Sequence, residues 1–219
     1  MGLDIYAYRV KSTLNTTNPN EIYAKLQEIA QTKFEKTTTK LLKEISKLHE
    51  TCSPVEYANA YNKFIMDLKR RVPLYKKYGF YLAKYGYEYR DNTITSIKSP
   101  QELEVIFNDE KKHIYPMSDA YFRKVNFIYE YFRNKLENES CVITKDELNE
   151  FIQHCKEVYN NKGDEDYAKQ VLPTTSGFFF GSTDYDDWYW NDVKDCIAQM
   201  QKIYKALKDD DYVMWDFSW

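Results

Sequence analysis

The two ends of the chain carry the pattern that most restricts its fold. Near the amino end, "LDIYAYRV" alternates between two faces, both of them largely apolar or aromatic. The carboxyl end, "YVMWDFSW", has the same character. Alternation over so few residues is typical of a short β-strand. We therefore expect the terminal strands to pair with each other, or with a central hairpin, in a small antiparallel sheet.

The chain between these ends reads mainly as helix. Ser-Pro pairs begin two helices, at Ser53 and Ser99, and Thr144 with Glu147 forms a capping box for a third. A hairpin with its turn at Asp91-Asn92 interrupts the series. The expected helices cover roughly 20–31, 34–49, 53–71, 74–84, a short stretch from 100, 118–136, 144–159, a turn at 164–171, and 183–207. The predicted fold is α+β, mostly helical, with one small antiparallel sheet.

Length and composition indicate one domain over residues 1–219. No apolar run is long enough to span a bilayer, and the amino end turns charged within four residues. We therefore expect a cytoplasmic protein with no membrane partner. The four cysteines are widely spaced and contain no Cys-x-x-Cys pair, which favours reduced thiols.

The segment "LPTTSGFFFGSTDYDDWYWND", residues 172–192, is unusual. Three phenylalanines between two glycines suggest a brief strand, with Phe178 and Phe180 on one side. Backbone amides at 181–183 would then open the last helix, with Thr183 or Asp184 as its cap, and such a helix start binds anions. The acids that follow satisfy the same helix end themselves, so both a ligand site and simple capping stay open.

Three segments together resemble a family of small proteins encoded by bacteriophages and prophages. They are "MGLDIYAY", "AYFRKVNFIYEYF" and "LPTTSGFFFGSTDYDDWYWNDVKD". The resemblance implies phage origin and assigns no activity. Residues 12–100 fall outside it and are expected to be a variable helical insertion with a hairpin. The family's tryptophan before Arg-Lys is Phe122 here, and its histidine is replaced near Tyr129, so no catalytic histidine is implied.

If these three segments meet in space, they bring together one set of polar residues. On the expected 118–136 helix, Arg123 and Asn126 would share a polar side. A ligand pocket and a helix-to-helix ion pair are both compatible with this arrangement. The candidate binding residues are Asp4, Arg123, Lys124, Asn126, Ser182, Asp184 and Asp187.

Residues 69–90 form a second candidate surface, with seven Lys or Arg against the single acid Glu88. Its tyrosines would stack bases and its cations would neutralise phosphates: Lys69, Arg70, Arg71, Lys76, Lys77 and Lys84. The same tyrosines also follow helical spacing, which indicates a core. The net charge of −3 disfavours general nucleic-acid affinity.

Signals for catalysis are weak. The histidines are scattered, and no phosphate-loop, dinucleotide or nucleophile-elbow motif is present. We predict no catalytic residues, no metal and no cofactor. The leading expectation is an accessory protein that binds a host or phage protein, one form being an anti-CRISPR-like inhibitor of bacterial defence. A small-molecule binder or enzyme with a pocket in the family-like segments is the first alternative, and a nucleic-acid binder through 69–90 the second.

Overall fold

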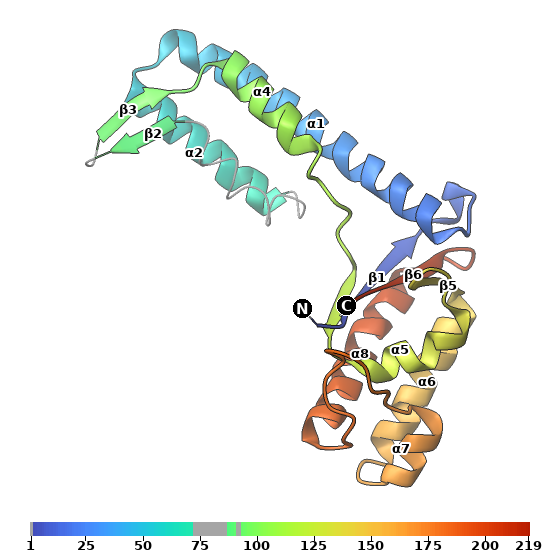
Figure 1. Cartoon of the computed structure of the whole chain (residues 1–219). Helices are drawn as coiled ribbons and strands as arrows, with labels where there is room; N and C mark the ends of the chain where they lie inside the picture. The colour runs from blue at the N-terminus through green and yellow to red at the C-terminus, as the bar shows by residue number, and fades with distance from the viewer. Residues whose placement is uncertain (1, 72–86, 91–92) are drawn as a thin grey trace. The chain divides into compact units, whose positions relative to one another are not determined.

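The computed structural model describes residues 2–71, 87–90 and 93–219, with side chains for all of these except 67–71, 87–90, 93 and 95 (Figure 1). The chain divides into two compact units. We call Met1–Ala24 with Met117–Trp219 the sheet unit, and Lys25–Pro116 the helical unit. The helical unit overlaps the range 12–100 that falls outside the family resemblance.

The sheet unit is built on a four-stranded antiparallel sheet with the order β4-β1-β6-β5. Its central strands are the chain ends, β1 (Asp4–Val10) and β6 (Tyr212–Ser218). Their pairing runs in register from Asp4 with Ser218 to Val10 with Tyr212. Of the two pairings expected from the sequence, the terminal strands form the one with each other, and the expectation that the central hairpin joins their sheet is wrong. The central hairpin, β2 (Tyr87–Arg90) with β3 (Thr93–Ile97), forms a separate two-stranded sheet in the helical unit.

The edge strands β4 (Ala120–Arg123) and β5 (Ser140–Thr144) were not expected from the sequence. The predicted helix over 118–136 is wrong in its first part, because this stretch pairs with β1 before turning at Lys124, where φ is 62°. Helix α5 then covers only Asn126–Phe132, followed by the 3-10 turn η2 (Arg133–Lys135). Ala120 and Phe122 point into the core while Tyr121 is exposed. Alternate residues of this stretch therefore share a face, as in a strand and not as in a helix.

One face of this sheet carries the core. Helices α5, α6 (Lys145–Asn160) and α8 (Asp187–Ala206) lie on that face, and α7 (Glu165–Val171) follows α6 (Figure 1). Trp215 is fully buried at its centre, with its ring 5.3 Å from that of Phe132 and 6.1 Å from that of Phe151. The predicted capping box of Thr144 and Glu147 begins α6. The core of the sheet unit therefore lies between this face and the helices that cover it.

The helical unit contains most of α1 (Pro19–Thr51), which starts in the sheet unit after the 3-10 turn η1 (Ser12–Leu14), together with α2 (Pro54–Arg71) and α4 (Pro100–Lys111). The sequence predicted two helices where α1 is one. No Gly or Pro interrupts 31–34, and Thr38 donates its hydroxyl to the Phe34 carbonyl at 3.0 Å, within the helix. The expected helix 74–84 lies outside the described residues.

The four cysteines are free thiols, three of them buried. Burial raises the pKa of the Cys141 thiol to about 12, so this group is unreactive at neutral pH. Among the described residues, no helix combines the length and apolar character needed to cross a bilayer.

Candidate functional site

The loop between α7 and α8 is held to the sheet unit by one buried side chain. Asn126, 3% exposed at the start of α5, donates through Nδ2 to the carbonyls of Phe180, at 3.3 Å, and Ser182, at 2.8 Å. Its Oδ1 accepts from the backbone N–H of Thr175 at 3.4 Å. An amide that satisfies three backbone groups of a loop defines the loop's path. We call this arrangement the Asn126 clamp.

The clamped loop presents an aromatic knuckle, Phe178–Phe180, and the strand expected there is absent. Phe180 is buried, with its ring 5.1 Å from that of Tyr129 and 5.5 Å from that of Trp219. Phe178 is 82% exposed and Phe179 44% exposed, with their rings 4.2 Å apart. A strand would need alternate residues to share a face, whereas here one phenylalanine points inward and two point to solvent.

The backbone of the knuckle is strained. Phe179 has φ of 72°, in the left-handed region that non-glycine residues rarely adopt. Its carbonyl accepts a 3.2 Å hydrogen bond from Leu3 N–H, which ties the knuckle to the residue just before β1. Strain of this kind costs about 1–3 kcal/mol and persists only where the surroundings impose it.

The start of α8 differs from the prediction. Asp186 is the cap, because its Oδ1 accepts from the backbone N–H groups of Trp188 at 2.9 Å and Tyr189 at 3.1 Å. Thr183 and Asp184 are not the cap, since Ser182 and Asp184 close a turn of their own: the Ser182 hydroxyl donates to Asp184 Oδ2 at 2.8 Å. The amides at 181–183 that were expected to open this helix therefore lie before its start at Asp187, and Asp186 itself occupies the first N–H groups of α8.

Five of the seven candidate residues line one cavity of about 330 Å³, in the sheet unit: Arg123, Lys124, Asn126, Ser182 and Asp184. The family-like segments thus meet, although Arg123 lies on β4 and Asn126 on α5 instead of on one helix. The remaining walls come from Val125, Phe127, Thr174, Gly181, Asp186, Trp188, Tyr189 and Asp192. The cavity is at the small end of the range for ligand pockets.

Asp4, the sixth candidate, faces Arg123 across the β1–β4 pair and does not line the cavity. Its Oδ1 accepts from the Tyr121 hydroxyl at 2.5 Å and lies 4.0 Å from Arg123 Nε. The hydrogen bond to Asp4 raises the pKa of Tyr121 to about 12. Asp4 therefore positions the two exposed side chains of β4.

Asp187, the seventh candidate, is exposed in the first turn of α8 and lies 3.5 Å from Lys162 Nζ. It too does not line the cavity. Such an exposed ion pair contributes little to stability.

Trp188 and Asp192 also line the cavity, although neither was among the seven candidate binding residues. Trp188 is 78% exposed. Burial and the nearby carboxylates of Asp195 and Asp186 raise the pKa of Asp192 to about 6. Asp192 has no ion pair or hydrogen bond within the part of the chain that the structure describes. The signal that could have found it is its spacing of three from Asp195 on a helix.

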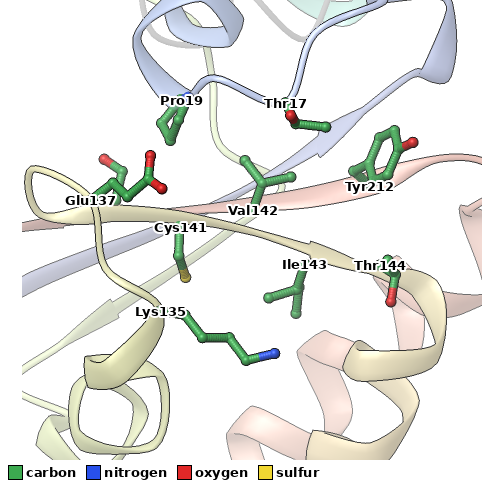
Figure 2. A pocket seen from close by; sticks show the side chains of 10 residues that line it. Thr17, Pro19, Lys135, Glu137, Cys141, Val142, Ile143, Thr144 and Tyr212 are labelled. Carbon is green, nitrogen blue, oxygen red and sulfur yellow. The ribbon is translucent and has the colours of Figure 1, made fainter.

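A second cavity of about 280 Å³ lies beside β5, at the opposite edge of the sheet (Figure 2). Val142 points toward Thr17 and Pro19, whereas Cys141 and Ile143 point to the other side of the strand (Figure 2). Lys135 is ion-paired with Glu147. None of the candidate residues lies here.

The basic segment stays untested. The side chains of Lys69, Arg70 and Arg71 and the whole of Lys76, Lys77 and Lys84 lie outside the described residues. Within the described ranges, no cluster of three or more His, Cys, Asp or Glu is arranged to hold a metal ion.

Comparison of the chain with protein-family models, with curated proteins and with solved structures gave no match in any of the three.

Proposed function

We propose that this chain is a non-enzymatic accessory protein that binds a host or phage protein in the cytoplasm through the aromatic knuckle. The observation that carries the proposal is the exposed pair Phe178–Phe179, which the Asn126 clamp and a strained backbone hold in place. Exposed aromatic rings that a fold fixes at a conformational cost are typical of contact residues.

Preorganisation explains why such a knuckle favours tight binding. A flexible loop loses conformational freedom when it binds, and this loss weakens affinity. Here Phe180 anchors the loop in the core, and a Cβ on Gly177 would approach the Phe180 ring to 2.7 Å, so this glycine permits the close fold. The exposed rings are therefore in position before a partner arrives.

The surroundings of the knuckle indicate the partner's charge. Trp188 follows the knuckle closely in the sequence and is largely exposed. The acids Asp184, Asp186 and Asp187 just before it are exposed as well. From residue 160 to the end, twelve Asp or Glu stand against six Lys. A partner with an apolar pocket and a basic rim would complement this surface.

Quantitative pull-down from infected host extract tests the proposal. The bait is the whole chain, compared with Phe178→Ala and with the control Tyr115→Ala, an exposed aromatic of the helical unit. We expect one stoichiometric partner, a loss of at least tenfold in its recovery with Phe178→Ala, and unchanged recovery with the control. Recovery that is equal for all three baits would contradict a role for the knuckle.

Inhibition of a bacterial defence system, as by an anti-CRISPR, is one concrete form of this activity. The resemblance to phage proteins supports it, and no individual residue does. Plaque counts on hosts with and without the defence system measure it. We expect expression of the chain to raise plating efficiency only on the defended host, and Phe178→Ala to remove the effect.

The cavity supports a second candidate function, binding of a small molecule. Its lining combines the cations Arg123 and Lys124 with the acids Asp184 and Asp192, which suits a ligand that carries both charges. Thermal-shift screening against nucleotides, amino acids and divalent metals tests this candidate. A ligand-induced shift that Arg123→Ala and Asp184→Ala both leave unchanged would place the ligand elsewhere.

A further inference from the structure

The two edges of the four-stranded sheet differ in how their backbone groups are used. In an antiparallel sheet, alternate residues of an edge strand bond to the neighbouring strand, and the residues between them direct N–H and C=O outward. Phe217 N–H donates to Glu139 O, which makes 139, 141 and 143 the residues bonded to β6. Lys124 N–H donates to Leu3 O, which makes 120, 122 and 124 the residues bonded to β1.

The β5 edge is nearly closed. Ser140 exchanges both backbone hydrogen bonds with Glu137, at 2.7 and 3.1 Å. Thr144 N–H donates to the Glu147 carboxylate at 2.7 Å, as part of the α6 capping box. Only Val142 directs its peptide groups outward without a recorded partner among the described residues. A single free residue offers too little backbone for another strand to pair with.

The β4 edge is open. Tyr121 and Arg123 are the residues that alternate with the β1-bonded ones, so their two N–H and two C=O groups point away from the sheet. Within the described part of the chain, no hydrogen bond reaches any of these four groups. Two residues of one edge strand whose backbone N–H and C=O groups are both unpaired form a template for strand addition.

We infer that β4 takes up an extended segment of a protein partner as a fifth strand of this sheet. This inference deepens the proposed binding function, on which it rests, by stating what the partner presents. The knuckle lies at the end of β4, because Leu3 donates to Phe179 O and a Cβ on Gly181 would lie 3.1 Å from Lys124 Cβ. A segment added to β4 therefore runs toward the exposed phenylalanines.

Side chains along this edge define the segment's chemistry. Arg123 is exposed, 4.0 Å from its partner Asp4, and Lys124 has no ion pair among the described residues. An acidic residue opposite Arg123 and Lys124 would complement both charges, and an aromatic or β-branched residue would pack beside Tyr121. Arg123 also discourages indiscriminate pairing of apolar edges, so the edge selects a complementary segment.

A second copy of the chain is the competing occupant. Two β4 strands paired about a two-fold axis at Phe122 would satisfy the same four groups. Such a contact involves two free residues from each copy and sets each Arg123 opposite Tyr121 of the other copy, so it offers the positive charges no acidic partner. A heterologous segment that also reaches the knuckle uses more of this surface, and we commit to it.

Amide hydrogen exchange on the whole chain tests the geometry without any partner. We expect the amides of Tyr121 and Arg123 to exchange at least tenfold faster than those of Phe122 and Lys124. Equal protection of all four would show that the edge is covered and would overturn the inference.

A displayed library of random twelve-residue peptides, selected on the whole chain, tests the occupant. We expect selected peptides to alternate with a period of two, to carry an acid, and to slow exchange at Tyr121 and Arg123. Tyr121→Pro removes one outward N–H and should weaken binding at least tenfold. Its matched control, Val142→Pro, removes the outward N–H of the other edge and should change binding less than twofold.

A second variant distinguishes a loss of binding from a folding defect. Arg123→Glu keeps the backbone and should favour selected peptides in which lysine replaces the acid. Peptides without alternation, or binding that is indifferent to both β4 variants, would overturn the inference. Sedimentation that reveals a dimer, lost in Tyr121→Pro, would assign the edge to a second copy and overturn the choice of occupant. If the pull-down partner depends on Phe178 and not on Tyr121, the proposed function survives and this inference fails.

Discussion

Each unit of the described chain fully buries one polar side chain, and the two are used differently. In the helical unit, Thr38 donates to the carbonyls of Phe34 and Glu35, inside its own helix. In the sheet unit, Asn126 binds Thr175, Phe180 and Ser182, about fifty residues along the chain. The first bond would form in any helix, whereas the second exists only in the folded unit. Of these two buried side chains, one is therefore satisfied locally and the other only by tertiary contacts.

Removing the indole ring at the centre of the sheet unit's core should give the largest loss in the free energy of unfolding. We expect Trp215→Ala to cost about 3–5 kcal/mol, because it leaves a cavity among buried aromatic rings. Amide exchange should rise in β1, β5 and β6 and stay unchanged in α4. Trp215→Phe should cost less than half as much, since the indole Nε1 has no hydrogen-bond partner and its loss leaves no polar group unsatisfied. Equal costs for the two variants would contradict this account.

Asn126→Ala should come next, with a loss of about 2–3 kcal/mol in the free energy of unfolding. The variant leaves the carbonyls of Phe180 and Ser182 without their buried donor. Urea titration measures it, and Thr38→Val is the matched change in the helical unit, expected to cost under about 1 kcal/mol. If both cost the same, the contrast between local and non-local bonding fails.

Asp192→Asn should stabilise the protein at pH 7 by on the order of 2 kcal/mol. The pKa of Asp192 is raised to about 6, so the folded state holds the proton more tightly than the unfolded state does. Its contribution is therefore most favourable below about pH 4 and is lost as pH rises through 6. The gain should vanish below pH 4 in urea titrations. Asp187→Asn, a change at an exposed neighbour, is the control and should leave the free energy of unfolding at pH 7 nearly unchanged.

The smallest expected loss of stability comes from removing a helix cap, and each unit has a capping box for comparison. Ser99→Ala in the helical unit and Thr144→Ala in the sheet unit should each cost about 1 kcal/mol, because both remove an acceptor for the third N–H of a helix. Amide exchange in the first turns of α4 and α6 measures the two losses separately. A loss at Thr144 several times larger would show that this cap also supports the β5 edge.

The local signals that were read correctly share one physical origin. Ser53, Ser99 and Thr144 precede helices because a short side-chain oxygen satisfies an N–H within three residues. The alternation of the chain ends predicted β1 and β6 for a similar reason, since it depends only on neighbouring residues. The predicted break between 31 and 34 was wrong because no residue there opposes a helix.

The candidate site was predicted in part. The segments that carry the family resemblance contain the five candidate residues that line the cavity, although the helix expected to carry Arg123 is a strand. The buried state of Asn126 was missed, because an asparagine between Val125 and Phe127 gives no local sign that its amide holds a distant loop. The exposure of Phe178 and Phe179 was missed for the opposite reason, since an apolar run normally indicates burial.

The sequence by itself determined the class of this fold, the starts of α2, α4 and α6 and the strands at its two ends, because these follow from periodicity and short-range hydrogen bonds. Only the tertiary structure decided which phenylalanine turns inward, which edge of the sheet stays open and where the loop after α7 is held. Those outcomes depend on contacts between residues far apart in the chain, and β1 is their common partner: it converts 120–123 into a strand and fixes the knuckle through Leu3.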